Sequence, residues 1–261
     1  MNMIKWDKYV DHIFCLQYLH NNRLNEITKT LTNIGINVYD SKFFSFVYDY
    51  EHCIFMNQYQ NMKEESFNFF NNNVYFEGSY LENDKHNYIF YLGFNTYRTL
   101  KIAQYFNYDR IIIFEDDIKF LKDTDYIIKA MDFVKEQDFD ICMCQTTFMD
   151  AWHGIKSYLV EDGCQDFGND MFLKTELPLG IYGGGFIILT NKGINKIVDY
   201  YENHNLMVCL DALDTLRDKM QLSTLFALKP LCIQRNMIDE WSEEQRKEEN
   251  INMIIEEYEY D

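Results

Sequence analysis

The sequence predicts an α/β fold in which a mostly parallel sheet is flanked by helices. Segments of strand length alternate with segments whose apolar residues recur every three or four positions, as in helices that cover a sheet. Residues 111–114 read Ile-Ile-Ile-Phe, and such a continuous apolar run is typical of a strand buried on both faces. With 261 residues, 47% of them hydrophobic, the chain is long enough to bury a core of this kind.

The chain begins with a predicted strand, a helix and a second extended segment. The strand covers residues 12–16, the helix ends at Gly35, and the extended segment starts at residue 36. The helix is predicted from apolar residues at helical spacing, namely Leu24, Ile27, Leu31 and Ile34. This β-α-β order is the unit of nucleotide-binding sheets. Residues 41–90 have no clear period, and we expect short helices and loops there.

Two helices are predicted on either side of the central apolar strand. Asn95 or Thr96 caps the first and Asp123 or Thr124 caps the second, because short polar side chains accept hydrogen bonds from the free N–H groups of a first turn. Their apolar faces comprise Tyr97, Leu100, Ala103 and Phe106 in the first helix and Ile127, Ile128, Met131 and Val134 in the second. A strand over residues 139–144 is expected next.

The rest of the chain is predicted to hold a long loop, a strand led by glycines and a charged tail. Residues 145–180 show no periodicity, so we expect a loop. Gly183, Gly184 and Gly185 precede a strand over residues 186–190, and glycines at such a place let another group approach the main chain closely. Thr190 caps a helix whose apolar face is Ile194, Ile197, Val198 and Tyr201. Short strands and a C-terminal amphipathic helix are predicted last, over residues 225–228, 231–233 and 239–261.

Composition and charge exclude several kinds of partner. Lys plus Arg is 24 and Asp plus Glu is 42, which gives 24 − 42 = −18. A chain this acidic repels nucleic acid and is not drawn to anionic bilayers by its general charge. The seven cysteines are odd in number and form no C-x-x-C, which favours reduced thiols. Because no apolar run reaches membrane-spanning length, we expect a soluble, cytoplasmic protein with no transmembrane segment.

Three acids, Glu115, Asp116 and Asp117, directly follow the central apolar strand. Like charges this close together are unfavourable unless a cation offsets them. The carboxyl end of a strand is also where open α/β sheets bind their ligands. The pattern therefore predicts a divalent-metal site. The alternative is a solvated acidic turn in which Asp117 simply faces water.

Other charged residues are candidates for the chemistry of such a site. Arg23 stands where the first loop turns into a helix, so it is either placed to reach a phosphate or base, or a surface arginine. Asp211 and Asp214 follow the last long predicted helix, and either suits a general base. Asp214 also suits the first turn of a short helix, where a carboxylate is favourable.

Taken in order, these segments resemble glycosyltransferase family 25, which includes lipooligosaccharide and procollagen galactosyltransferases. The similar segments are residues 13–23, 94–102, 112–117, 184–193 and 210–211, with Pro230 and Gln234 at the end. Two positions depart from that family. Asn95-Thr96 stands where the family has Ser-His, and the first loop reads Gln17-Tyr18-Leu19-His20 where the family has Asn-Leu-Asp.

The resemblance implies a GT-A-type, Rossmann-like fold and transfer of a sugar, with inversion, from a UDP-sugar donor to a glycan or other hydroxyl acceptor. It implies Mn²⁺ (or Mg²⁺) held by Glu115 and Asp117, with Gln234 as a further ligand. It also implies Asp211 as the base, with Asp214 as second choice. The residues implied to bind the donor are Leu16, Arg23, Glu115, Asp116, Gly184 and Gly185.

The absence of a linker or repeat predicts one domain over residues 1–261. With the resemblance, this domain divides into a nucleotide-sugar-binding half (1–145), an acceptor-side half (146–238) and a charged tail helix (239–261).

Two other functions are compatible with acids after a buried strand. A phosphatase of the haloacid dehalogenase type carries Asp-x-Asp there, but here the two positions are Glu115 and Asp117, so the nucleophilic aspartate is missing. A non-catalytic module that binds sugar nucleotides or an assembly partner has no need to hold three acids together. We therefore expect a glycosyltransferase, with the binding module as the alternative.

Overall fold

The computed structural model describes most of the chain between residues 3 and 234. The described residues are 3–17, 23–48, 83–120, 123–145, 160, 163–175, 184–210, 213 and 216–234. Within the long helix that begins at residue 83, side chains are described from residue 92 onward. The tail helix predicted over residues 239–261 lies outside the described residues.

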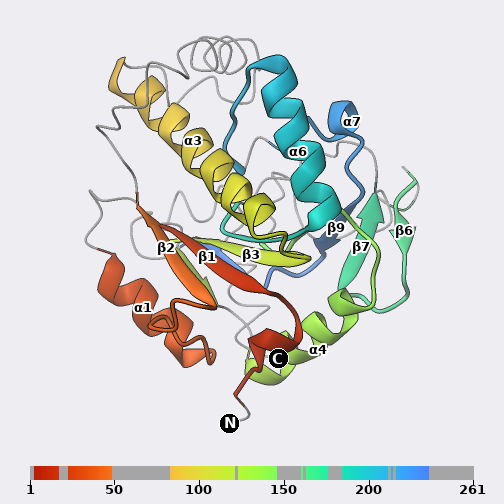
Figure 1. Cartoon of the computed structure of the whole chain (residues 1–261). Coiled ribbons are helices and arrows are strands. Elements are labelled where there is room, and N and C mark those ends of the chain that lie inside the picture. Colours follow the sequence, from red (N-terminus) through yellow and green to blue (C-terminus); the bar gives the residue numbers. More distant parts are fainter. Residues whose placement is uncertain are drawn as a thin grey trace, which may run out of the picture.

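An eight-stranded sheet forms the centre of the molecule (Figure 1). Its strands lie in the order β2-β1-β3-β8-β5-β9-β7-β6. Their bounds are β1 His12–Gln17, β2 Phe44–Tyr48, β3 Arg110–Glu115, β5 Ile141–Met143, β6 Gln165–Asp166, β7 Phe172–Thr175, β8 Phe186–Thr190 and β9 Thr224–Ala227. β1 pairs in parallel with β2 and β3, and β5 with β9, whereas β8 is antiparallel to both of its neighbours. β7 is antiparallel to β9 and β6, so β7 and β8 alone among these strands run against the rest. The predicted mostly parallel sheet is confirmed.

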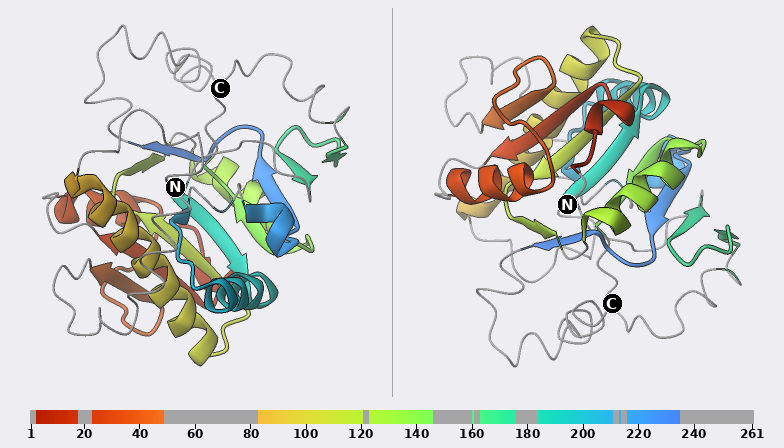
Figure 2. Two further views of the ribbon diagram at one scale, coloured as in Figure 1. Left: turned by 90° about the horizontal axis from the view of Figure 1, so that it is seen from above. Right: turned by 90° about the horizontal axis from the view of Figure 1, so that it is seen from below.

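Helices cover both faces of this sheet (Figures 1 and 2). On one face lie α3 (Asn83–Tyr105), α6 (Asn191–His204) and the short α7 (Arg217–Met220). On the other lie α1 (Leu24–Asn33) and α4 (Thr124–Lys135), with the 3-10 turn η1 (Trp6–Lys8). The predicted α/β class, with helices flanking the sheet, is confirmed.

Alternation along the central strand explains why the fold has two cores. Ile111 and Ile113 of β3 pack with α3 and α6, and Ile112 and Phe114 pack with α1 and α4. All four side chains have no exposed surface. Because successive residues of a strand point to opposite faces, the apolar run fills both cores at once.

A second, two-stranded sheet extends from the carboxyl end of β3. It pairs β4 (Ile118–Phe120) antiparallel with β10 (Cys232–Gln234), with Gln234 opposite Ile118. β4 begins directly after the three acids, so β10 is carried to the same edge of the main sheet as those acids.

Several sequence predictions are confirmed at helix ends. Asp123 caps α4, because its side chain accepts a hydrogen bond from Tyr126 N at 2.7 Å. Thr190 caps α6 by accepting one from Gly193 N at 3.2 Å. Gly35 follows α1 with φ +88°, the left-handed conformation that glycine adopts without strain. The described cysteines are free and buried, as expected of reduced thiols.

Three element predictions are wrong. Asn95 and Thr96 do not cap a helix, since α3 already begins at Asn83 and both residues are buried inside it. The expected strand from residue 36 is an irregular segment with a turn, because Asn37 Oδ1 accepts from Tyr39 N, and the strand beside β1 is β2 instead. The stretch 145–180 is not simply a loop, since it contains β6 and β7.

Within the described part of the chain, no helix combines the length and the apolar character needed to cross a lipid bilayer.

Candidate functional site

The three acids lie at the carboxyl end of β3, at the point where the main sheet passes into the small one. Glu115 is the last residue of β3, and Ile118 already belongs to β4. Glu115 is 7% exposed and Asp116 is 0% exposed, while Asp117 is partly exposed. Of the alternative, a solvated acidic turn before a capped helix, the structure shows the Asp123 cap and a partly exposed Asp117, whereas Glu115 and Asp116 are buried.

Gln17 holds Asp116 in place. β1 and β3 are parallel with Leu16 opposite Glu115, so the next residue of each strand, Gln17 and Asp116, leave the sheet side by side. Gln17 Nε2 donates to Asp116 Oδ2 at 2.7 Å, and both side chains are buried. A hydrogen bond to a charged acceptor in a site of low dielectric is strong and fixes the carboxylate's orientation.

Sequence analysis did not select Gln17 for the site. The available signal was a polar residue at the end of the otherwise apolar run Ile-Phe-Cys-Leu, in a strand expected to end at the same edge as the acids.

Arg23 supplies the positive charge nearest the acids in the described structure. It directly precedes α1, and its Nη1 lies 3.4 Å from Asp117 Oδ2 and 3.8 Å from Asp116 Oδ1. Its side chain is 22% exposed. The sequence placed Arg23 in the site, and the structure brings it there, although it faces two carboxylates. Repulsion among the acids is thus partly offset by the chain itself.

The charges of the acids extend to the strands on both sides. Burial raises the pKa of the Cys15 thiol on β1 well above its usual value, and the negative charges of Asp116, Asp117 and Glu115 raise it further. Burial also raises the pKa of Cys232 on β10, with added effects from Cys144, Asp117 and Glu115. Both thiols stay protonated at neutral pH, so neither is a nucleophile. The negative charges of the three acids therefore act on side chains of both β1 and β10.

Gly185 is enclosed by the strands that carry the site. Its carbonyl accepts from Glu115 N at 3.1 Å, which ties the start of β8 to the end of β3. A Cβ at this position would overlap Gln145 Oε1 and lie 2.8 Å from Ile118 Cγ2, so a larger residue would require both side chains to move. The glycines were expected to let a substrate or another backbone approach the main chain, but the groups that approach Gly185 are the side chains of Gln145 and Ile118. Gly184 is buried next to it.

The structure gathers the predicted donor and metal residues at one edge of the sheet. Leu16 pairs with Glu115, and Gln234 pairs with the residue that follows Asp117. With Arg23, Asp116, Gly184 and Gly185, these residues come from four separate stretches of the chain. The two candidate bases, Asp211 and Asp214, lie outside the described residues.

The acids do not form a complete metal cage. Within the described residues no group of three or more His, Cys, Asp or Glu side chains is arranged to hold a metal ion. One or two carboxylates suffice, however, where phosphate oxygens of a substrate supply the other ligands, as is usual for Mg²⁺ sites. Glu115, Asp117 and Gln234 offer oxygen atoms alone, which suit Mg²⁺ or Mn²⁺. These residues fit an ion that arrives with a diphosphate.

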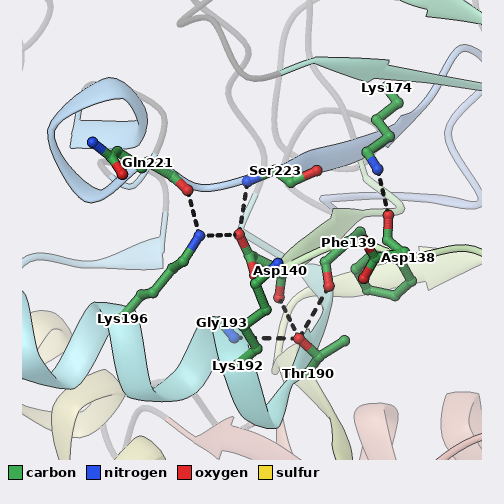
Figure 3. A network of polar contacts seen from close by, with 10 residues as sticks. All are labelled: Asp138, Phe139, Asp140, Lys174, Thr190, Lys192, Gly193, Lys196, Gln221 and Ser223. Atoms are coloured by element: carbon green, nitrogen blue, oxygen red, sulfur yellow. Dashed lines mark hydrogen bonds and ion pairs between the residues drawn. The ribbon is translucent and has the colours of Figure 1, made fainter.

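A further buried carboxylate, Asp140, lies at the opposite edge of the sheet, directly before β5 (Figure 3). Asp140 Oδ2 is 2.7 Å from Lys196 Nζ of α6 and accepts from Ser223 N at 2.9 Å. Asp140 Oδ1 lies 3.5 Å from Lys192 Nζ. This group ties α6 to β5 and to the residue before β9, and we call it the Asp140 cluster.

Comparison with known proteins finds distant similarity to solved structures. No model of a protein family matches the sequence, and no curated protein matches it. Among solved structures, the crystal structure of mouse Xyloside xylosyltransferase 1 in its apo form is similar over 80% of this chain and 80% of that chain. The sequence identity is 12% and the TM-score is 0.34. A similarity of this size does not assign an activity to this chain.

Proposed function

We propose that this chain is a glycosyltransferase that moves a sugar from a nucleotide-sugar donor, UDP-linked, to a hydroxyl acceptor on a glycan, a lipid-linked sugar or a protein. The observation that carries the proposal is the acid trio at the carboxyl end of β3, in which Glu115 and Asp116 are buried and which Gln17 and Arg23 contact. Burying carboxylates side by side is unfavourable for stability, and such an arrangement is typical of a site that binds a charged ligand. The resemblance to family 25 supports the same activity.

The chemistry of sugar transfer accounts for the residues at this edge. A nucleoside diphosphate leaves with negative charge, which a chain of net charge −18 repels unless a cation intervenes. A Mn²⁺ or Mg²⁺ ion held by Glu115 and Asp117, with Gln234, would supply Lewis-acid stabilisation of that leaving group. Arg23, one side of which is open to solvent, is placed to pair with a phosphate when the donor arrives.

Other side chains of the protein carry out the remaining steps of the transfer. Asp116, fixed by Gln17, orients the ribose or a metal ligand. Inversion requires that the acceptor hydroxyl attack from the face opposite the diphosphate, so a base must stand on that face. Asp211, or Asp214 in its place, is the residue we assign to take the hydroxyl proton.

Release of UDP tests the proposal directly. The purified chain is incubated with Mn²⁺ and, in turn, UDP-galactose, UDP-glucose, UDP-N-acetylglucosamine and UDP-xylose, with and without simple sugar acceptors. We expect UDP release with at least one donor, and its loss when EDTA is added. Release that persists in EDTA would contradict the metal assignment while leaving the transferase assignment in place.

The alternative function is a non-catalytic module that binds a nucleotide-sugar-like ligand or an assembly partner. The observation in its favour is that the described residues contain no complete metal-binding group. Binding of a UDP-sugar without UDP release from any donor would favour this module over the enzyme.

A further inference from the structure

Gln145 is a buried amide at the same edge of the sheet that the proposed function does not use. It follows Cys144 just beyond the end of β5, and it is 1% exposed. The main chain around it is fixed, because Cys144 N and Gln145 N both point to Phe186 O, at 2.9 and 3.4 Å. Leu231 N donates to Cys144 O at 2.8 Å from the segment that leads into β10. Gln145 is therefore held among β5, β8 and β10.

The Gln145 side chain points at Gly185. A Cβ on Gly185 would overlap Gln145 Oε1, so the amide occupies the space that a side chain at position 185 would take. Gly185 in turn accepts the backbone hydrogen bond from Glu115. One glycine thus separates the Gln145 amide from the strand end that carries the acids.

The oxygen of this amide has no hydrogen-bond partner among the residues that the structure describes. The Gln145 Oε1 atom is buried, and it lies against Gly185, next to the strand end that carries the acids. Leaving a buried amide oxygen unpaired destabilises a fold, and native proteins keep few such groups. An unpaired acceptor beside a ligand site is explained if the ligand brings the donor.

We propose that Gln145 binds the sugar of the donor by accepting a hydrogen bond from one of its hydroxyl groups. This inference rests on the proposed function and adds a residue that selects the sugar. A sugar hydroxyl suits the position, because the group is neutral and donates, whereas phosphate oxygens only accept. A buried acceptor of this kind discriminates strongly against a sugar that lacks the hydroxyl, since the oxygen is then left unpaired again.

Comparing the binding of UDP with the binding of UDP-sugars separates a contact with the sugar from a general effect on the whole site. Binding of UDP and of the four UDP-sugars named above is measured by calorimetry in Mn²⁺ buffer, for the unaltered chain and for Gln145→Met. Methionine keeps the length and apolar stem of glutamine and removes the amide. We expect Gln145→Met to lower the affinity for the best-binding UDP-sugar by about tenfold, which corresponds to the loss of one good hydrogen bond. The affinity for UDP should stay within about twofold.

Thermal stability gives a second readout that a structural role would not produce. Removing an unpaired buried oxygen should leave the melting temperature unchanged or raise it, whereas removing a structural hydrogen bond lowers it. Gln137→Met is the matched control, because Gln137 is a partly buried glutamine that donates to Phe133 O beside α4, away from the acids. The Gln137→Met variant should change neither the affinity for UDP nor that for the UDP-sugar.

The outcomes separate the two proposals. Equal affinities of the unaltered chain and Gln145→Met for UDP-sugar would overturn the role of Gln145, as would equal weakening of UDP and UDP-sugar. A lower melting temperature with unchanged UDP-sugar affinity would make Gln145 structural. If the unaltered chain binds neither UDP nor any UDP-sugar, the proposed function itself fails and this inference falls with it. Gln145→Asn serves as a second variant, since it keeps the amide but withdraws it from the sugar, and it should repeat the selective loss.

Discussion

The two edges of the sheet both bury carboxylates, but they compensate them differently. Asp140 has Lys196 at 2.7 Å, Lys192 at 3.5 Å and a backbone N–H donor from Ser223. At the opposite edge the acid trio faces Arg23, whose closest contact is 3.4 Å from Asp117. The buried Asp140 carboxylate therefore has two lysines within 4 Å, whereas Asp116 and Asp117 share one arginine.

This difference separates a structural ion pair from a candidate binding site. The Asp140 cluster ties α6 to the sheet, because Asp140 Oδ2 accepts hydrogen bonds from Lys196 and from Ser223 N (Figure 3). The acid trio lies where open α/β sheets bind ligands, beside Gly185 and the unpaired Gln145. We expect substitutions at the Asp140 edge to change stability, and substitutions at the trio to change activity.

The largest expected effect is the loss of activity in Asp117→Ala. If Asp117 holds the ion that stabilises the leaving diphosphate, UDP release should fall about a thousandfold or more, corresponding to several kcal/mol of transition-state stabilisation. The melting temperature should change little, because the side chain is partly exposed. Unchanged UDP release would remove the metal assignment.

The matching change at the opposite edge is Asp140→Ala, which should destabilise without inactivating. It leaves the Ser223 N–H and Lys196 without their carboxylate, and breaking such a buried pair costs about 3 kcal/mol. Urea unfolding measures this loss, and UDP release per folded molecule should stay at the level of the unaltered chain.

Lys192→Ala is the control for that pair. Lys192 is 57% exposed and 3.5 Å from Asp140, so its removal should cost less than about 1 kcal/mol. A loss of UDP release in Asp140→Ala at full folding would contradict the division of roles between the two edges.

The sequence predicted the strand that carries the acids more reliably than the contacts of the site. The apolar run of β3 and its acids are local features, and so are the caps at Asp123 and Thr190. The contact between Gln17 and Asp116 depends on the register of two strands 99 residues apart. The contact of Gln145 with Gly185 depends on β8 lying between β3 and β5. A local sequence pattern predicts neither the register of two strands nor their order in the sheet.

The wrong predictions have the same origin. Asn95 and Thr96 suit an N-cap by type, but the helix continues on both sides and Thr96 Oγ1 donates to Leu92 O within it. The apolar Val38 was expected in a strand. It instead lies in a turn, and its buried side chain packs in the core between the sheet and helices α1 and α4.

A smaller effect on activity is expected from Gln17→Leu, which tests how the trio is held. Without the Nε2 donor, Asp116 stays buried but loses the bond that orients it. Losing a partner that orients a metal-site residue lowers activity by about 10- to 100-fold, so UDP release should fall less than in Asp117→Ala. Gln137→Leu is the matched control. A Gln17→Leu variant as active as the unaltered chain would show that Asp116 needs no orientation.

The smallest effect is a pH dependence at the edge opposite the trio, where His12 begins β1. Burial lowers the pKa of His12, whose ring stacks on Tyr108 and contacts Lys42 O and Ser45 Oγ. The unfolded chain therefore binds a proton at higher pH than the folded one, and stability is lost as pH falls below the ordinary histidine value of about 6.5.

His12→Phe should lose less stability than the unaltered chain between about pH 7 and 5 in urea titrations, because phenylalanine keeps the ring and cannot be protonated. Since the acids titrate alike in both proteins, the difference between the two slopes reports His12 alone. Identical slopes would mean that His12 keeps its ordinary pKa in the fold, and UDP release should be unaffected because the ring lies at the far edge of the sheet.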